Sequence, residues 1–394
     1  MKIKSLILGS AAALLAVSGA RAADAVMAPE PEPVDYVRVC DAYGAGFFYI
    51  PGTETCLSIN GYVWFQVAAS SAKDLGDTPG YYAGPEDGWY TGSRVRINFD
   101  ARSDTELGTL RGWMRLQADW DGSKGGTTFN GGDGPVAIDQ AFVQLGGLVA
   151  GYGESAWFYQ FNNSKLNYGS FTWGGLYYGY QERSRISYEF GGKDGLYGVI
   201  SLENPADEYS YMPDVVGRIG YSAAWGAVAL TAAYDHDRTG DLKFPLVDDG
   251  NKSAVALSAA ALFNIPSMPG SAFKIVGYYN SADSNYGPGS PLAGYAGGGF
   301  FGQPVWSVLA SFLYQATPNL GLIVSGQYFG DHYLAGSKDT YKDVFGSKET
   351  AWAAELEAVW TPVKNFEVRP TIAYTKADHL DGSASGYLRF TRYF

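Results

Sequence analysis

Arginines recur at short, even spacings along three segments of the chain. Residues two or four apart on an extended strand point to the same side, and a guanidinium group stays charged and offers several donors to carboxylates and other anions. A row of them would create an electrostatic field for ions and polar solutes, without making or breaking bonds. The arginines are Arg94 and Arg96, Arg111 and Arg115, and Arg183 and Arg185.

Other residue types that could do chemistry form no catalytic or metal-ligating pattern. His236, His332 and His379 lie far apart, and none has a partner at metal-ligand spacing. No G-x-S-x-G, H-E-x-x-H or P-loop pattern occurs. Glu355 and Glu357 could imitate the carboxylate pair of a glycosidase, but their position on one predicted strand favours part of a polar wall. We therefore expect no enzyme, no cofactor and no metal.

The arginines lie on segments in which polar and apolar residues alternate. Arg94, Arg96 and Asp100 share one parity, and Val95 and Phe99 share the other, as in a strand with one wet and one apolar face. Sixteen such segments occur, mostly long enough to cross a bilayer at a tilt. They are 57–67, 89–101, 108–120, 137–146, 147–153, 183–191, 195–203, 215–223, 225–235, 252–263, 271–280, 304–315, 319–329, 350–360, 364–375 and 386–394.

The connections between these segments alternate between long and short. The short ones follow even-numbered strands and include 102–107, 146–147, 191–195, 316–318 and 361–363. In an outer-membrane barrel, short periplasmic turns alternate with long external loops. The sequence therefore predicts an all-β fold, a sixteen-stranded antiparallel transmembrane β-barrel over 57–394, with both termini on the periplasmic side.

Aromatic residues often stand at the ends of the apolar faces. Such girdles are typical of the two membrane interfaces of a barrel, although the core of a soluble β-sandwich would also place aromatic residues on alternating strands. These residues are Trp120, Phe190, Tyr221, Tyr234, Phe263, Tyr279, Trp360, Phe366 and Tyr374.

Residues 1–22 have the features of a secretory signal peptide. Lys2 and Lys4 precede an apolar run from Leu6 to Val17, and Ala20-Arg21-Ala22 supplies a cleavage site. Removal of this segment takes away three basic and no acidic residues, so the formal net charge moves from -12 to -15. Such an acidic chain argues against a nucleic-acid partner.

A segment with two cysteines, 23–56, precedes the predicted barrel. Cys40 and Cys56 are the only cysteines, and an even pair in an exported chain favours a disulfide over two free thiols. Their spacing fits neither a C-x-x-C redox pair nor a zinc ribbon.

The longest odd-numbered connection, 154–182, is rich in aromatic residues and has few charges. Its charged residues are Glu154, Lys165 and Glu182. The strands of a barrel this large enclose an aqueous channel, and an exposed loop that apolar would be adhesive. We therefore expect this third external loop to fold inward and narrow the channel.

The arginines would line the wall opposite that loop. If the turn around Asp104 sets the register, Arg94 falls across from Arg115, and Arg96 lies diagonally near Arg111 and Arg115. Like charges placed opposite each other cost stability, so a functional positive wall would explain them. Equally, the arginines could be scattered lumen charges that acidic residues balance. The acidic residues are Asp100, Asp119, Glu189 and Glu203.

Three stretches resemble the alphaproteobacterial general porins: Val37 to Val63, the TELGTLRG turn from Thr105, and Tyr211 to Gly226. The resemblance implies a homotrimer in the outer membrane, with diffusion of small hydrophilic solutes and ions through each subunit past the third loop. Phe394, Phe390 and Leu388 are similar to the C-terminal pattern that barrel-insertion machinery reads. Ala23 and the Pro/Glu-rich residues after it resemble the start of outer-membrane proteins tethered to peptidoglycan.

Three functions remain for such a barrel. The first is passive diffusion, with the six arginines, Glu154, Lys165 and Glu182 at the pore constriction. The second is a more selective channel in which aromatic residues of the third loop stack on saccharides. The third is a structural or adhesive barrel whose long loops bind an outside partner.

Overall fold

The computed structural model describes residues 38–71, 88–121, 135–158, 166, 169–171, 176–205, 211–236, 253–292 and 300–394. The signal peptide expected over 1–22, the proposed tether at Ala23 and Lys165 of the third loop lie outside these residues.

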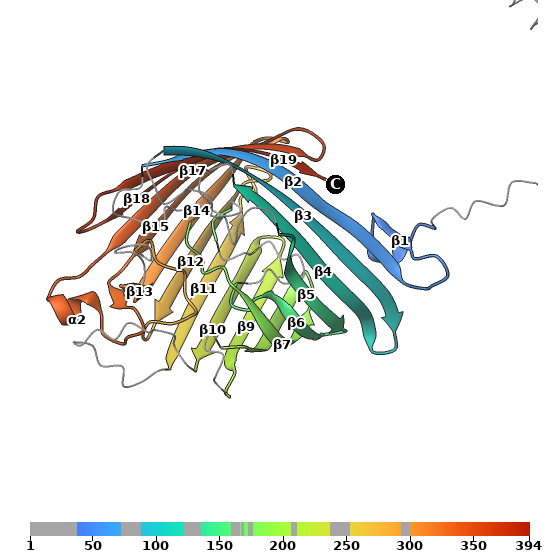
Figure 1. Cartoon of the computed structure of the whole chain (residues 1–394), viewed down its shortest axis with the longest axis horizontal. Coiled ribbons are helices and arrows are strands. Elements are labelled where there is room, and N and C mark those ends of the chain that lie inside the picture. Colours follow the sequence, from blue (N-terminus) through green and yellow to red (C-terminus); the bar gives the residue numbers. More distant parts are fainter. Residues whose placement is uncertain are drawn as a thin grey trace, which may run out of the picture.

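Sixteen long strands in this part of the chain pair with their neighbours in sequence, and β19 pairs with β2, so the sheet closes into a barrel (Figure 1). All these pairings are antiparallel, and the predicted fold is confirmed. The strands are β2 Cys56–Ser70, β3 Gly88–Thr105, β4 Gly108–Asp121, β5 Ala137–Leu145, β6 Leu148–Glu154, β7 Glu182–Gly191, β8 Gly195–Glu203, β9 Asp214–Ala223, β10 Gly226–Asp235, β11 Ala254–Asn264, β12 Ala272–Asn280, β14 Trp306–Thr317, β15 Leu320–Phe329, β17 Ala351–Val363, β18 Phe366–Ala377 and β19 Ser383–Tyr393.

The two faces of the barrel differ as the alternation predicted. Along β10, Val228 and Leu230 point outward and are exposed, whereas Ala229 and Thr231 point into the lumen and are buried. Most of the predicted girdle residues are exposed on the outer face, which fits a barrel wall in contact with lipid. They are Trp120, Phe190, Tyr221, Tyr234, Phe263, Tyr279, Trp360 and Tyr374.

One end of the barrel, here called the turn end, carries the tight turns. Gly146 and Gly147 join β5 to β6, and Lys364 and Asn365 join β17 to β18, where Asn365 has a φ of 63°. Asparagine tolerates this left-handed conformation better than most residues. The other end, the loop end, carries the long connections.

The loop-end connections differ widely in length. The β18–β19 connection, residues 378–382, is shorter than the turn-end connection 265–271 between β11 and β12. It is still longer than the two-residue turn before it, Lys364 and Asn365, so long and short connections alternate as predicted.

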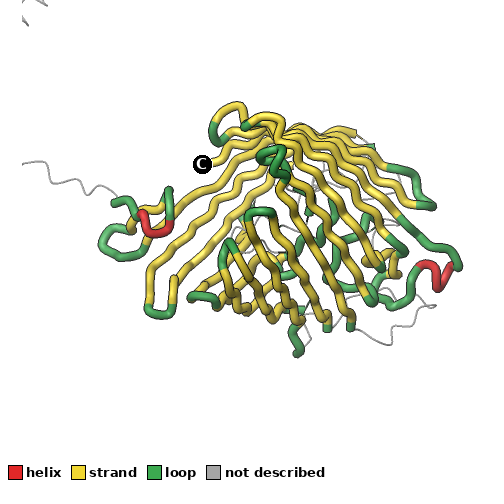
Figure 2. The backbone as a smooth tube through the Cα atoms, turned by 180° about the vertical axis from the view of Figure 1, so that it is seen from behind, coloured by secondary structure: helices red, strands yellow, loops and turns green. Residues whose placement is uncertain are grey.

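Short helices and strands lie at both ends of the barrel (Figure 2). At the loop end, β13 (Phe301–Pro304) pairs with β16 (His332–Leu334), and the helix α2 (Tyr341–Phe345) begins at a capping box made by Thr340 and Asp343. No helix in the described ranges is long and apolar enough to cross a membrane.

The last strand completes the closure. Phe390 of β19 lies opposite Phe65 of β2, and the backbone of Phe394 exchanges two hydrogen bonds with Gly61, at 3.0 and 3.1 Å. Leu388 and Phe394 are exposed on the outer face. The predicted C-terminal pattern is thus displayed on the outside of the closing strand.

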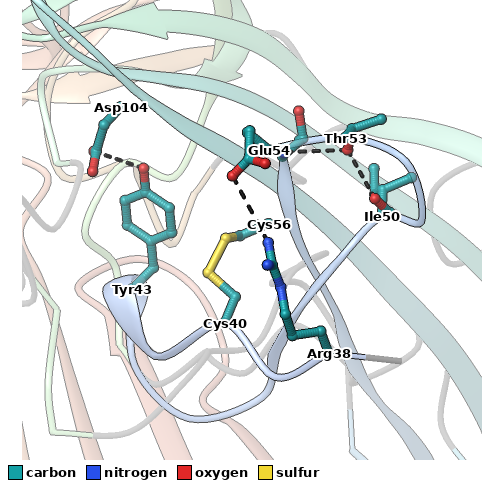
Figure 3. The surroundings of a disulfide bond; sticks show 9 residues. Arg38, Cys40, Tyr43, Ile50, Thr53, Glu54, Cys56 and Asp104 are labelled. Carbon is teal, nitrogen blue, oxygen red and sulfur yellow. Dashed lines mark hydrogen bonds and ion pairs between the residues drawn. A yellow bond between two sulfur atoms is a disulfide. The ribbon is translucent and has the colours of Figure 1, made fainter. Parts of the chain in front are cut away.

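A small cap at the turn end holds the predicted disulfide. Cys40 and Cys56 are bonded and packed with Phe47, and β1 (Phe47–Tyr49) pairs with the start of β2. The 3-10 helix η2 (Asp41–Tyr43) brings the Tyr43 hydroxyl to the Asp104 carboxylate, to which it donates at 2.7 Å (Figure 3). Burial and this hydrogen bond raise the pKa of Tyr43 to about 12, which keeps it a donor. The cap is therefore tied to the β3–β4 hairpin.

Candidate functional site: the lumen and its third loop

The β3–β4 hairpin sets the partners of the first arginines. The strands continue to Thr105 and Gly108, so the turn is only Glu106 and Leu107, and the Thr105 hydroxyl, which donates to the Gly108 carbonyl at 2.6 Å, closes it. The predicted register assumed a longer turn around Asp104 and is wrong by four residues along β4.

This register places Arg94 and Arg96 opposite polar or acidic partners. Arg94 lies across from Asp119 and Arg96 across from Gln117. The Arg94 Nε and Nη2 atoms donate to the two Asp119 oxygens at 2.5 and 3.1 Å, a bidentate geometry that favours a strong ion pair. Arg94 is therefore compensated across the strand pair rather than repelled by Arg115.

Asp139 reaches the lumen through an irregularity in β5. Arg115 pairs with Gln140 and Leu116 with Ile138, so Asp139 is the extra residue of a β-bulge. A bulge re-aims a side chain, and the Asp139 carboxylate lies 3.3 Å from Arg96 Nη2 and also bonds Arg115 Nε. Asp139 was not predicted as a lumen residue, because a bulge leaves no mark on simple alternation.

Arg115 gathers three carboxylates. Besides Asp139, its Nη2 atom lies 2.9 Å from a Glu182 oxygen, and its Nη1 atom lies 3.5 Å from Glu154. Tyr180 donates to the same Glu182 oxygen at 2.8 Å. Glu154 ends β6 and Glu182 begins β7, so Arg115 ties both ends of the intervening loop to the wall.

The remaining predicted arginines are spread along the lumen. Arg111 binds Asp100 near the turn end, with Nε 2.8 Å from the carboxylate. Arg185 bonds Ser187 and lies 3.7 Å from Glu189. These two do not join the Arg115 cluster.

Arg183 lies at the base of the loop. Its guanidinium donates to the Gln181 side chain at 2.8 Å and lies over the Tyr286 ring, 5.8 Å from the centroid. It belongs to the loop end rather than to the basic row.

Four further cations that are buried on the lumen side of the described strands were not predicted from the sequence. Arg369 lies 2.9 Å from Glu367 and 3.6 Å from Glu357, so the two acids of β17 and β18 serve an ion-pair network. The alternation of their strands marks all four as lumen-facing. They are Arg218, Lys274, Arg369 and Arg389.

The described part of loop 3, the name used here for residues 155–181, lies inside the barrel. Trp157, Leu166 and Leu176 are almost fully buried in one cluster with inward-facing residues of the barrel. Burying a side chain of this size stabilises by about 1.5–3 kcal/mol. The inward fold predicted for the third loop is thus confirmed for these residues.

The wall that receives loop 3 is built from small side chains. We call it the small-residue wall, and it comprises the inward residues Ala227, Ala229, Ala233, Ala254, Ala256, Ala260 and Ala272 of β10, β11 and β12. Short side chains leave room for the aromatic loop at the density of a protein interior.

Polar contacts fix the course of loop 3 over this wall. The Tyr177 backbone exchanges hydrogen bonds with the Gln327 side chain at 2.9 Å in both directions. Lys274 donates to the Ser170 carbonyl at 2.9 Å and lies 4.6 Å from the centre of the Phe171 ring. The loop is therefore held from β12 and β15 as well as at its base.

The histidines form no metal site. His332 Nδ1 lies 2.9 Å from the Glu349 carbonyl oxygen, and His379 bonds the Glu349 carboxylate. Among the residues that the structure describes, no group of three His, Cys, Asp or Glu side chains could hold a metal ion.

A closed barrel with an apolar outer face, a charged lumen and an inward third loop defines the class of outer-membrane channel proteins. The family model described as "Porin subfamily" matches residues 24–388. The chain therefore belongs to this porin family, which confirms the resemblance, the outer-membrane location and the expectation that it is not an enzyme.

Curated relatives agree with this assignment. Porin Omp2b of Brucella abortus (strain 2308) is 42% identical over 263 residues, and that of Brucella canis is 42% identical over 262 residues. The match covers 60% of this chain and 66% of each relative, so the chain spans just under two thirds of their length.

Solved structures share the fold at low identity. The outer membrane channel DcaP of Acinetobacter baumannii has a TM-score of 0.61 at 13% identity, with 88% of this chain and 99% of that chain covered. An anion-selective porin from Comamonas acidovorans has a TM-score of 0.54 at 12% identity, with 86% and 100% covered.

Proposed function

We propose that the chain forms a passive, water-filled channel for small hydrophilic solutes and ions across the outer membrane. The observation that carries this proposal is a closed barrel whose charged side chains face the lumen. Pore size and wall charge would then act as the filter, without a tight binding site.

The constriction we propose lies between loop 3 and the charged wall, the name used here for the lumen faces of β2 to β7 and β17 to β19. Its residues are Arg94, Arg96, Arg111, Arg115, Arg183, Arg185, Glu154, Glu182 and Lys165. We propose a division of roles: Arg94 and Arg96, which pair with Asp119 and Asp139 of the wall, set the charge of the aqueous path, while Arg115 with Glu154 and Glu182 anchors the loop.

We also propose a homotrimer embedded in outer-membrane lipid. A trimer form is described for OmpT of Vibrio cholerae, which shares this fold with a TM-score of 0.53. Reconstitution tests both proposals: the refolded mature chain should give large ohmic current steps in a planar bilayer, arriving in threes. A refolded barrel without steps would mean a plugged lumen and would contradict the diffusion channel.

A saccharide channel is the second candidate, and burial argues against it. Trp157 and Phe158 are almost completely buried, and Phe158 packs on Tyr180 with ring centroids 5.0 Å apart. Aromatic rings used in this way offer no open face to a sugar. Concentration-dependent block of the ion current by oligosaccharides would support the saccharide channel instead.

A structural or adhesive barrel is the third candidate. It predicts that the refolded chain conducts no current, so the same bilayer recording separates it from the diffusion channel.

The peptidoglycan tether at Ala23 rests on the sequence pattern alone. Digestion of purified sacculi with muramidase should release an amino-terminal peptide of increased mass if the tether exists. Recovery of only the unmodified amine would remove the proposal.

A further inference from the structure

The connection between β12 and β14 also enters the lumen. Tyr286 and Leu292 are both 0% exposed, and Tyr286 belongs to the same buried cluster as Trp157 of loop 3. The described residues 281–292 of this connection, called loop 6 here, thus form a second inward element next to loop 3.

Three carboxylates at the ends of adjacent strands hold loop 6. The Tyr286 hydroxyl donates to Asp214 at 3.1 Å and to Glu203 at 3.3 Å. Asp235 accepts from the Ser284 hydroxyl at 3.0 Å and from the Asn285 backbone at 2.6 Å. Hydrogen bonds to charged acceptors are stronger than neutral ones, so loop 6 is fastened to β8, β9 and β10.

Loop 3 is fastened at the same point. Glu203, which accepts from Tyr286, also accepts from the Ser155 hydroxyl at 2.6 Å and the Ala156 backbone at 2.7 Å. Arg218 of β9 donates to the Ala156 carbonyl at 2.6 Å. One buried carboxylate therefore serves both loops.

The two loops also contact each other directly. The Trp157 indole nitrogen donates to the Gly287 carbonyl at 3.0 Å, and its ring meets the Tyr286 ring edge-on at 6.1 Å. At Gly179, φ is +73°, and an added Cβ would lie 1.8 Å from the Gly287 oxygen. Only glycine allows this approach in this conformation.

We propose that loop 6 is a second determinant of pore size, in which Tyr286 and Gly287 are positioning residues that hold loop 3 across the lumen. The inference rests on the proposed function, because it assumes that loop 3 sets the limiting cross section. By a clamp we mean the contacts of Tyr286 and Gly287 with loop 3. Without this clamp, the start of loop 3 would be held only by its contacts with the barrel strands. The passage would then widen and fluctuate.

Gly179→Ala tests the contact, with Gly52→Ala as the matched control. Gly52 lies in the turn-end cap with a φ of +77°, and an added Cβ there meets nothing within 4 Å. Both substitutions carry the same backbone strain, but only Gly179→Ala forces the loops apart. Tyr286→Phe is a second variant, which keeps the ring and removes the two hydrogen bonds to carboxylates.

The measurement is swelling of proteoliposomes in sugars of increasing size, with open-channel current noise in planar bilayers. Gly179→Ala and Tyr286→Phe should raise the uptake of a disaccharide relative to a pentose about twofold and increase the noise, whereas Gly52→Ala should match the parent. If Gly179→Ala does not fold, the size selection and noise of Tyr286→Phe test the proposal instead.

The outcomes distinguish failure of the proposed diffusion channel from failure of the contact between loop 6 and loop 3. A parent protein that refolds but admits no sugar would overturn the proposed function itself. A conducting parent whose folded Tyr286→Phe variant has unchanged size selection and noise would overturn the clamp alone.

Discussion

The charged wall and the small-residue wall use the same strand alternation for opposite purposes. On the charged wall, inward positions carry arginines paired with acids, such as Arg94 with Asp119 at 2.5 Å. On the small-residue wall, inward positions carry alanines such as Ala229 and Ala256, and loop 3 covers them.

The difference shows how a barrel can keep a wet path and an anchored loop in one lumen. Ion pairs compensate the inward charges and leave a polar lumen surface, whereas a loop needs apolar burial to offset the entropy of ordering it. Arg115 lies at the junction, because it belongs to the charged wall but holds both ends of loop 3.

Removal of Arg115 should have the largest effect. Arg115→Ala leaves Asp139, Glu154 and Glu182 without their shared cation, and breaking a buried charge pair costs about 3–5 kcal/mol. We expect a corresponding drop in the free energy of unfolding in lipid vesicles, measured by urea titration with tryptophan fluorescence.

Arg115→Lys is the control, because it keeps the charge without the planar fork, and it should lose less stability. Equal stability of Arg115→Ala and the parent would show that the loop ends do not depend on this cluster.

Acidification should loosen the loop end around β13 and β16. His332 of β16 is buried between Phe301 and Phe329, faces Asp331 and the Glu349 carbonyl, and burial lowers its pKa to about 4 from 6.5. A folded-state pKa below the unfolded value gives stability that is full above pH 6.5 and is lost as the pH falls through 4. The full loss amounts to about 3 kcal/mol.

Hydrogen exchange of residues 330–350 at pH 4 and pH 7, corrected for intrinsic rates, measures this loss. His379 acts in the opposite sense, because its hydrogen bond with Glu349 raises its pKa, so stability from that contact is lost as the pH rises. His332→Gln should remove the acid-dependent part, and unchanged acid sensitivity in this variant would assign the effect elsewhere.

The barrel could be predicted almost completely from the sequence. Residue types alternate with a period of two along the strands of both walls. The reason is that outward positions face lipid and inward positions face a polar or packed lumen, so each position is restricted in residue type. The aromatic content of the third loop likewise required burial, and the lumen was the place available.

Side-chain contacts within the lumen could not be predicted as accurately as the barrel itself. The register of Arg94 depends on a turn of two residues, and the position of Asp139 depends on a bulge; both are local backbone features that alternation does not encode. Loop 6 has no aromatic run of the kind seen in loop 3, and Tyr286 meets Trp157 from 129 positions away in the chain. Such contacts follow from the closed fold rather than from any local pattern.

Overfilling the small-residue wall should have an intermediate effect. Ala260 points inward beneath the loop cluster, whereas its neighbour Ala259 points outward into an apolar hollow of about 650 Å³ in the lipid-facing surface. Ala260→Phe should destabilise by about 1–3 kcal/mol through overpacking and displace loop 3, seen as altered conductance. Ala259→Phe adds the same ring on the other face and should be tolerated, so equal responses would break the comparison between faces.

Single amide substitutions on the charged wall should have a smaller effect on stability than Arg115→Ala, because the amide can still form hydrogen bonds, and a clear effect on ion selectivity. Arg94→Gln leaves Asp119 uncompensated beside the aqueous path and should shift the reversal potential across a salt gradient toward cations. Asp139→Asn leaves Arg96 and Arg115 with one acidic partner fewer. It should shift the reversal potential toward anions. Because Arg94 and Asp139 carry opposite charges on the same wall, opposite signs of the shift would identify that wall as the electrostatic filter. Two shifts of the same sign would instead indicate that each substitution acts by moving loop 3, which would leave the charged wall with a structural role only.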